Sequence, residues 1–434
     1  MAKYIIGGVL SVIGVVVVLM WVGVIPGLRT LDNPTLTRAH LTMWGVEDER
    51  DVFEGLIGAF QSANPGVKVS YEKKRMETYE EDLLRAFAAG TGPDIFNVHH
   101  LWLPKYRDIL GAAPERAFPF ADFRSSFADV VQRDFTSGGN VYGVALYVDT
   151  LALYFNIDLF NSAGVAFPPK DWDEFVADSR KLTFRKQSGD IQISGAAMGS
   201  GKNVVDSADI LALLMLQYGV PLLDQNGRLS FKSATGVSSQ GNAAERALEF
   251  YTSFAKQGSP NYSWSGASAG TSEDLFAQNK AGMMVGYASA RARLLRKSPR
   301  LKFEVAPLPQ VKGSVFRKNY ASYWGWGVYK NSNASSAAWE FLKFLTAPEN
   351  NAYYLALTGR PAGQRQLVEG QQQDQKMKVF ADQALSAVSW PQPDSKVIEN
   401  VFTEMIETQI TSDQPFRQTL TAAEAKINSL LRKP

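Results

Sequence analysis

The sequence predicts an α/β protein, because segments with a strand-like period of two alternate with segments that carry a helical stripe. In the first such stretch, strand-like segments 41–44, 67–71 and 94–98 alternate with helix-like segments 48–60 and 78–89. A β-α-β-α-β order implies a parallel sheet with helices on its faces. The chain has 434 residues, which is too long for one sheet and therefore predicts two lobes.

The same alternation continues towards the C-terminus. Helices are predicted over 171–182, 207–219, 242–258, 337–346 and 347–359, a helix followed by a strand over 271–287, and strands over 301–309 and 323–330. An Asn-Gly pair in "LLDQNGRLSF" predicts a β-hairpin over 222–231. Asp171 and Asp173 stand at a predicted helix start, where carboxylates cap the free N–H groups.

The stretch "VALYVDTLALYF" predicts two short buried strands, 144–147 and 151–155, with Asp149 at their junction. Both runs are rich in residues that favour strands. An acid in such a place is either a turn residue or a group that faces a cleft. The local sequence leaves both interpretations open.

The charge balance argues against nucleic acid as a partner. The chain has 45 basic and 43 acidic residues, and two of the basic ones, Lys3 and Arg29, lie in a segment without acids. The remainder is neutral in sum and shows no basic footprint. There is no cysteine, which excludes disulfides, thiolate metal sites and cysteine nucleophiles.

The N-terminus carries the clearest local signal. Residues 4–28 form a 25-residue run without a charge, which is long enough to cross a bilayer as a helix. The run is longer than the apolar region of a typical cleaved signal peptide, and no convincing cleavage site follows it. We therefore expect an uncleaved single-pass anchor over residues 1–30, followed by a polar linker over 31–38.

No catalytic, metal or cofactor motif stands out. The adjacent pair His99 and His100 is expected to point to opposite faces of a strand, so a shared metal is not expected. The "GSGKN" stretch (199–203) lacks the spacing of a phosphate-binding loop. We predict no enzyme activity and no cofactor.

Aromatic residues gather instead at predicted strand ends and in loops. Each one alone is more often a core residue than a ligand contact. As a set with nearby carboxylates they suit a neutral, hydroxyl-rich ligand, because rings cover the C–H faces of a sugar and carboxylates accept its hydroxyl protons. In open α/β sheets such ligands bind beyond the carboxyl ends of the strands.

The order of several segments resembles the extracellular solute-binding proteins of ABC importers, the group that includes the maltose-binding proteins. The segments are "LTMWGVEDERDVFEGLIGAFQSANPGVKV", "LLRAFAAGTGPDIF", "VYGVALYVDTLALYFNIDLFNSAG" followed by "PPKDWDEF", "LFAQNKAGMMVGY", "FEVAPLP", and "AAWEFLKFLTAPE" followed by "TGRPA". The resemblance implies a two-lobe periplasmic-binding-protein-like fold of type II, with a hinge that the chain crosses more than once. It also implies that ligand is held between the lobes.

The resemblance further implies a division of the chain and a set of ligand contacts. Lobe 1 would comprise 39–148 and 323–370, and lobe 2 would comprise 149–322 and 371–434. By motif position, the residues expected to contact the ligand are Glu47, Asp48, Trp102, Tyr147, Asp149, Trp264, Tyr287, Trp324 and Trp390. Asp94 is expected to be structural.

The resemblance completes the functional expectation. The chain would be a monomeric, membrane-anchored binding protein whose body lies outside the cell, where it would capture a sugar-type ligand and present it to ABC permease subunits. The alternatives are a secreted or tethered carbohydrate-active enzyme and a sensory ectodomain with another ligand. Peptides, polyols and betaine-like cations also suit aromatic clefts, so the sequence does not identify the ligand.

Overall fold

A computed structural model describes residues 38–231, 242–265, 270–392 and 394–431. The predicted anchor (residues 1–30) and all but the last residue of the predicted linker lie outside these residues. Within the described ranges, no helix is both long enough and apolar enough to span a bilayer.

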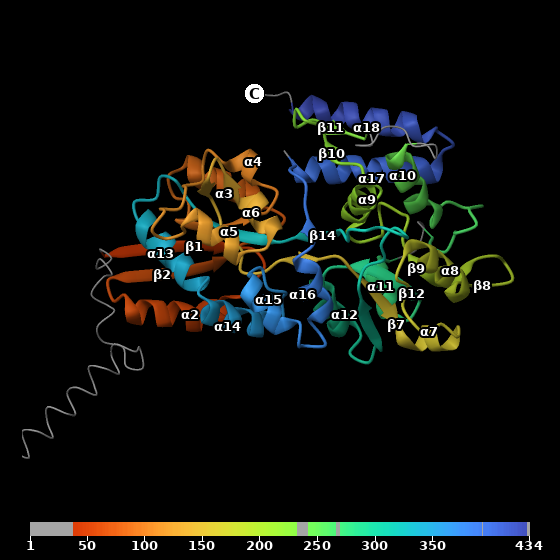
Figure 1. Cartoon of the computed structure of the whole chain (residues 1–434), viewed down its shortest axis with the longest axis horizontal. Helices are drawn as coiled ribbons and strands as arrows, with labels where there is room; N and C mark the ends of the chain where they lie inside the picture. The colour runs from red at the N-terminus through yellow and green to blue at the C-terminus, as the bar shows by residue number, and fades with distance from the viewer. Residues whose placement is uncertain (1–37, 232–241, 266–269, 393, 432–434) are drawn as a thin grey trace, which may run out of the picture.

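Lobe 1 is built on a four-stranded sheet in the order β15-β3-β1-β2 (Figure 1). Its strands are β1 (Ala39–Gly45), β2 (Val67–Lys73), β3 (Ile95–His99) and β15 (Trp324–Val328). β1 is parallel to β2 and β3, and β15 is antiparallel to β3. The first two crossovers contain α2 (Arg50–Ala63) and α3 (Tyr79–Ala88). This arrangement confirms the β-α-β-α-β prediction.

The helices of lobe 1 bury one stripe each, as the predicted helical period requires. In α2 the buried side chains are Phe53, Leu56 and Phe60, which are spaced to lie on one helix face. The other elements of this lobe are α4 (Leu103–Tyr106), α5 (Phe120–Ser126), α6 (Asp129–Phe135), β4 (Thr136–Ser137), β5 (Asn140–Val141), α13 (Ser335–Leu345), α14 (Pro348–Thr358) and α15 (Arg365–Gln371).

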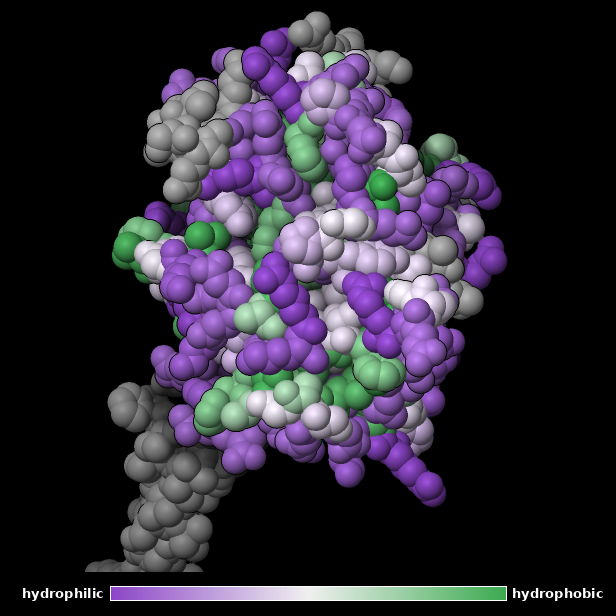
Figure 2. All heavy atoms as spheres, turned by 90° about the vertical axis from the view of Figure 1, so that its right-hand side faces the viewer, coloured by the Kyte–Doolittle hydropathy of each residue, from purple (hydrophilic) through white to green (hydrophobic). Residues whose placement is uncertain are grey.

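Lobe 2 is built on a five-stranded sheet in the order β13-β7-β12-β9-β8. Its strands are β7 (Ala152–Asn156), β8 (Phe184–Arg185), β9 (Ile191–Ala197), β12 (Ala281–Gly286) and β13 (Phe303–Ala306). Its helices are α7 (Ile157–Ser162), α8 (Trp172–Leu182), α9 (Ser207–Gln217), α10 (Ala243–Ser253), α11 (Ser272–Ala277), α12 (Ala288–Lys297), α17 (Ser395–Thr411) and α18 (Phe416–Leu431). The outer face of this lobe is mostly hydrophilic, with an apolar band along its lower edge and a few smaller apolar groups (Figure 2).

Two local predictions in lobe 2 are confirmed. The Asn-Gly stretch forms the antiparallel hairpin β10 (Leu222–Leu223) and β11 (Leu229–Ser230). Asp171 caps α8, because its side chain accepts a hydrogen bond from the Glu174 N–H at 2.9 Å. In lobe 1, Asp94 is structural as expected, since its carboxylate accepts hydrogen bonds from the backbone and the hydroxyl of Thr42.

Each lobe has its own hydrophobic core. The core of lobe 1 draws on residues 41–148 and 321–368, with a few later alanines, whereas the core of lobe 2 draws on residues 151–320 and 380–427. The chain therefore passes between the lobes more than once. The domain limits given above stay predictions.

A small ribbon joins the lobes where the chain crosses. It consists of β6 (Asp149–Thr150), β14 (Asn319–Ser322) and β16 (Ala387–Val388), in the order β16-β14-β6, and α16 (Lys378–Ala384) packs beside it. The predicted strand 144–147 is wrong. Val144 and Tyr147 form only isolated bridges, to Trp326 and Ala362, because the segment passes between two different neighbours instead of following one.

Glycines in β15 allow that segment to approach closely. A Cβ at Gly325 would lie 2.4 Å from the Phe135 ring and 2.8 Å from the Val144 carbonyl oxygen. Neither neighbour is the free end of a flexible side chain. The Trp-Gly alternation of β15 is therefore a packing requirement.

We predict that Gly325→Ala destabilises the protein by about 1–3 kcal/mol, because the added methyl group overpacks a buried contact. Urea unfolding followed by circular dichroism measures the change. Gly370→Ala is the matched control, since nothing lies within 4 Å of its Cβ position in α15, and we expect it to be neutral or slightly stabilising. Equal stability of the two variants would contradict the packing assignment.

Candidate functional site

A cleft of about 640 Å³ lies between the two lobes. Lobe 1 lines it with the ends of β3 and β15 and with residues before α3, whereas lobe 2 lines it with the loop and first turns of α9 and with α17. Ser322 and Trp390, at the ends of the crossing segments, also lie in its lining. Both lobes and the segments that cross between them therefore contribute to the lining of the cleft.

The wall on lobe 1 is aromatic. Trp102 and Trp324 meet edge to face with ring centroids 5.2 Å apart, and His99 lies 5.0 Å from Trp324. Behind them, Tyr79 stacks on Trp102 at 6.1 Å. The structure thus brings the predicted residues Trp102 and Trp324 together. Burial lowers the pKa of His99 well below its usual value, so its ring is neutral at pH 7.

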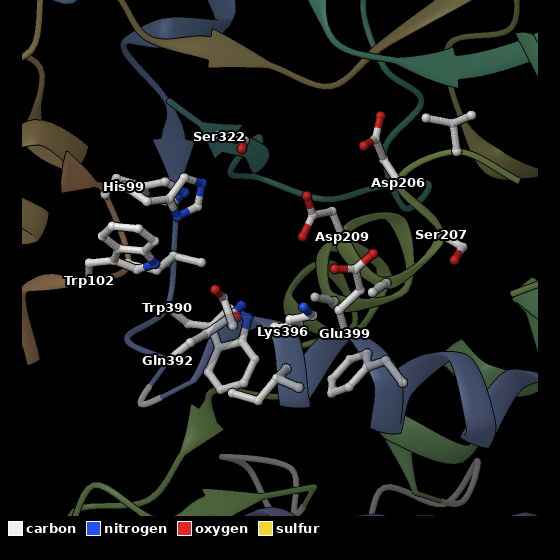
Figure 3. Close-up of a pocket in the computed structure, with 18 of the residues that line it drawn as sticks. His99, Trp102, Asp206, Ser207, Asp209, Ser322, Trp390, Gln392, Lys396 and Glu399 are labelled. Carbon is white, nitrogen blue, oxygen red and sulfur yellow. The ribbon is translucent and has the colours of Figure 1, made fainter. Parts of the chain in front are cut away.

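The wall on lobe 2 is acidic. Asp206 and Asp209 lie at the start of α9, and Glu399 projects from α17, across from His99 and Trp102 (Figure 3). Asp206 and Asp209 are half-buried, but the surrounding protein excludes most water from their carboxyl groups. Burial is the largest cause of their raised pKa values, about 8 for Asp206 and about 6 for Asp209.

Sequence reasoning missed this acidic wall. Residues "DSAD" (206–209) stand at the start of a helical stripe, which is also the pattern of an ordinary helix cap. The structure shows that Asp206 is the N-cap residue of α9 but forms no side-chain cap bond. An uncapped aspartate in a cleft was not distinguishable from a capping one by its spacing.

The floor of the cleft is organised by a buried carboxylate. Asp134 accepts hydrogen bonds from His100 Nδ1 at 2.9 Å, from the Tyr323 hydroxyl at 2.7 Å and from the Ser389 hydroxyl. The rings of His99 and His100 lie 4.5 Å apart, and both residues line the cleft. The expectation of opposite faces is wrong for this pair, because His100 lies beyond the end of β3.

No metal cluster accompanies these histidines. Among the described residues, no group of three or more histidine, aspartate or glutamate side chains is arranged to hold a metal ion.

Three of the predicted residues form a separate network. Arg360 pairs with Glu47 at 2.7 Å and with Asp48 at 2.9 Å, and its guanidinium lies 4.2 Å from the centre of the Tyr147 ring. Tyr354 donates to Asp48 at 2.8 Å, and Tyr147 donates to Glu47. Burial raises the pKa of Asp48, whereas Arg360 opposes that rise. These groups satisfy one another and do not line the cleft. Their role as ligand contacts stays a prediction.

The other four predicted residues lie in different surroundings. Asp149 accepts hydrogen bonds from the backbone N–H groups of Thr150, Ala288 and Ser289, and so it fixes the start of α12 beside β6. Burial raises its pKa to about 6. Of the two interpretations left open, this structure favours the structural one. Trp390 lines the cleft and packs on Phe402 at 6.3 Å.

Tyr287 and Trp264 are both buried. The Tyr287 hydroxyl donates to Asp209 at 2.7 Å, so it supports the acidic wall from behind. Trp264 is 0% exposed and donates to the Asn203 side chain at 2.8 Å. In this structure the ring of Trp264 belongs to the core of lobe 2 and is inaccessible to a ligand.

An ion pair bridges the rim of the cleft. Lys105 Nζ, in α4 of lobe 1, lies 2.7 Å from Glu80 in the same lobe and 3.1 Å from Asp394 in lobe 2. Asp394 also caps α17 by accepting the Val397 N–H. The lysine therefore holds the lobes together at the edge of the cleft.

Comparison of the sequence with known proteins identifies the family to which this chain belongs. Residues 46–352 match the family model of the bacterial extracellular solute-binding proteins. The maltodextrin-binding protein MdxE of Bacillus subtilis is 25% identical over 319 residues, which cover 72% of this chain and 70% of that protein.

Solved structures share the fold. The sugar-binding protein MalE of Xanthomonas citri superposes with a TM-score of 0.75 at 22% identity, over 91% of this chain and 97% of that one. The cyclic alpha-maltosyl-1,6-maltose binding protein of Arthrobacter globiformis gives a TM-score of 0.74 at 18% identity, over 91% of this chain and 99% of that one. At these identities the likeness shows the fold alone.

We predict that Asp394→Asn opens the cleft, because it removes the charge that pairs with Lys105 while asparagine preserves the helix cap. Since the chain has no cysteine, Asp108→Cys and Arg317→Cys allow spin labels to be placed one on each lobe. The distance between the labels should lengthen or broaden in the variant and in wild type at 1 M salt. An unchanged distribution in both samples would show that the pair does not restrain the lobes.

We also predict a pH-dependent gain in stability for Asp206→Asn. The pKa of Asp206 in the folded protein, about 8, lies above its ordinary value of 3.8. The carboxyl group therefore contributes most to stability below pH 3.8, and that contribution is lost as the pH rises towards 8.

The Asn variant lacks this loss, and asparagine tolerates the left-handed backbone of this position. Its Tm advantage over wild type should grow by at least about 2 °C between pH 5 and pH 8, as differential scanning calorimetry measures. Asp108→Asn, an exposed acid, should show no such growth. A pH-independent difference for Asp206→Asn would contradict the raised pKa.

Proposed function

Because the chain belongs to the family of bacterial extracellular solute-binding proteins, we propose that it captures a carbohydrate-type ligand between its lobes for ABC-type import. The observation that carries this proposal is the cleft itself, which Trp102 and Trp324 line from lobe 1 and Asp206 and Asp209 line from lobe 2. Aromatic faces cover the apolar C–H surfaces of a sugar, and carboxylates accept hydrogen bonds from its hydroxyl groups. The two walls come from different lobes, so only a closed cleft offers both.

Because the two walls belong to different lobes, ligand binding favours closure of the cleft. A ligand that touches both walls binds the closed form more tightly than the open form, and it shifts the population towards closure by that difference in affinity. The permease subunits of an importer then recognise the closed form. Residues 1–30, outside the described part of the chain, would tether this body to the outer side of the cell membrane, and the body would act as a monomer.

We further propose that the protein does not catalyse a reaction on its ligand. A glycosidase places two carboxyl groups on opposite sides of the scissile bond. Asp206 and Asp209 instead lie three residues apart on one wall of the cleft. Lobe 1 adds Glu77 and Glu80 to the lining, and Glu80 is paired with Lys105 at the rim. A tethered enzyme would need one of these lobe 1 carboxylates at hydrogen-bonding distance from the same bond as an acid of lobe 2.

Binding is tested by thermal unfolding of the purified protein with maltose, maltotriose, maltotetraose and arabino-oligosaccharides. A ligand that binds only the folded state, at about one hundred times its Kd, stabilises it by roughly 2.7 kcal/mol. We expect a raised Tm with at least one of these sugars and no release of new reducing ends. Absence of any shift across the panel would reject these neutral sugars as ligands, and product formation would favour the enzyme.

Trp324→Ala should weaken sugar binding by at least about tenfold, because it removes one ring of the aromatic wall. Isothermal titration with the best sugar of the panel measures the change. Tyr353→Ala is the control, since that ring is 49% exposed on lobe 1 and does not line the cleft. Equal affinity of the two variants would place the ligand elsewhere.

A further inference from the structure

The cleft holds more negative than positive charge. Among the described residues that line it, five are acidic and two are lysines. Glu80 is neutralised by Lys105 at the rim, and Lys202 lies 4.0 Å from Glu407. Lys396 alone is left to balance the acidic wall. His99 adds no positive charge, because its ring is neutral.

Asp206 has a left-handed backbone conformation at the edge of the cleft. Its φ is 59°, in a region that aspartate and asparagine adopt more often than other residues with a side chain. Its carboxylate forms no hydrogen bond or ion pair within the described part of the chain, and it does not cap α9 although it occupies the N-cap position. The backbone therefore directs an unpaired acid towards the cleft.

The nearest cation does not satisfy this acid. Arg293 contributes a favourable charge at a distance, but its guanidinium is engaged with Glu273 at 2.6 Å and 3.1 Å. Asp209 accepts one hydrogen bond from Tyr287 and has a favourable charge interaction with His100, whereas Glu399 repels it. Asp209 and Asp206 also repel each other. A desolvated carboxylate without a paired counter-charge is unfavourable, and Asp206 has no such partner in the described part of the chain.

A second, independent observation on the opposite side of the cleft points the same way. His100 is 2% exposed and lines the cleft, and its Nε2 has no hydrogen-bond partner. Its Nδ1 must donate to Asp134, because an ionised carboxylate only accepts. Nε2 is therefore left to a ligand in the cleft. Each wall thus presents a polar group without a partner in the described part of the chain, Asp206 on lobe 2 and His100 on lobe 1.

We propose, on the basis of the binding function above, that the ligand is a sugar or sugar-like molecule with a basic amine, which lies between Asp206 and Asp209. An ammonium group supplies both the missing charge and several N–H donors. The rings of Trp102 and Trp324 on the facing wall attract the same positive charge through their π faces. A metal ion is the other way to supply the charge, but the described residues form no group of three suitable ligands.

The test compares pairs of sugars that differ only in the amine. Glucosamine and its β-linked dimer and trimer are titrated calorimetrically at pH 6, each against its N-acetylated counterpart, with maltotriose as a neutral reference. The amine carries a positive charge at this pH, whereas the acetamide does not. The pKa of Asp206 is about 8, so binding of the ammonium group releases the proton that this carboxyl group holds at pH 6. We expect each amine form to bind at least about tenfold more tightly than its acetylated partner, because its hydrogen bonds to the carboxylates are charge-assisted.

Two variants locate the effect. Asp206→Asn and Asp209→Asn should each remove most of the preference for the amine, whereas Asp108→Asn, a change of an exposed acid outside the cleft, should preserve it. Circular dichroism confirms that the variants are folded. An amine preference that survives in both cleft variants would overturn the assignment to these two acids.

The remaining outcomes separate this proposal from the proposed function. Binding of maltotriose or of the acetylated sugars with no advantage for the amines would overturn the amine proposal and leave the sugar-binding function standing. Binding of neither class by a folded protein would reject both.

Discussion

The hydrogen bonds that converge on the Asp134 carboxylate hold together the part of the molecule on which the cleft depends. They join His100 at the end of β3, Tyr323 after β14 and Ser389 after β16. These segments belong to a lobe 1 strand and to two crossings between the lobes. A buried carboxylate with several donors is strongly held, because removing it would leave each donor without a partner. The floor of the cleft is therefore firmly held, and it is the part about which the lobes would turn if they close as proposed.

The walls of the cleft differ in how they are supported. The aromatic wall is held by packing, since Trp102 lies between Tyr79, Tyr106 and Trp324. The acidic wall is held by backbone geometry and by one hydrogen bond, from Tyr287 to Asp209. Packing orders a wall without specifying a charge, whereas the charged groups of the acidic wall come from lobe 2. If the cleft binds its ligand as proposed, its preference for charge would rest on lobe 2.

The sequence was sufficient for the fold class, and for some of the site. Periodicity located the strands and helices of both lobes, because each buries one face. It failed for residues 144–147, whose apolar run reflects burial between two neighbours without strand pairing. Trp102, Trp324 and Trp390 could be proposed from their positions after strands and in loops. Asp206 and Asp209 could not, because capping and ligand binding use the same residues at the same spacing, and only the three-dimensional structure shows which groups remain unpaired.

The ribbon of crossing strands lies next to the floor of the cleft. Ser322 and Trp390 lie in its floor, next to the strands through which the chain passes between lobes. When two rigid bodies rotate about a pivot, points near the axis move least and points at the rim move most. If the lobes close about the ligand as proposed, a ligand that rests on Trp390 would meet almost the same surface in the open and in the closed molecule, and the contacts of the rim would form later. The contact with Trp390 would then set the rate of productive encounter, and the contacts of the two walls would set the rate of release.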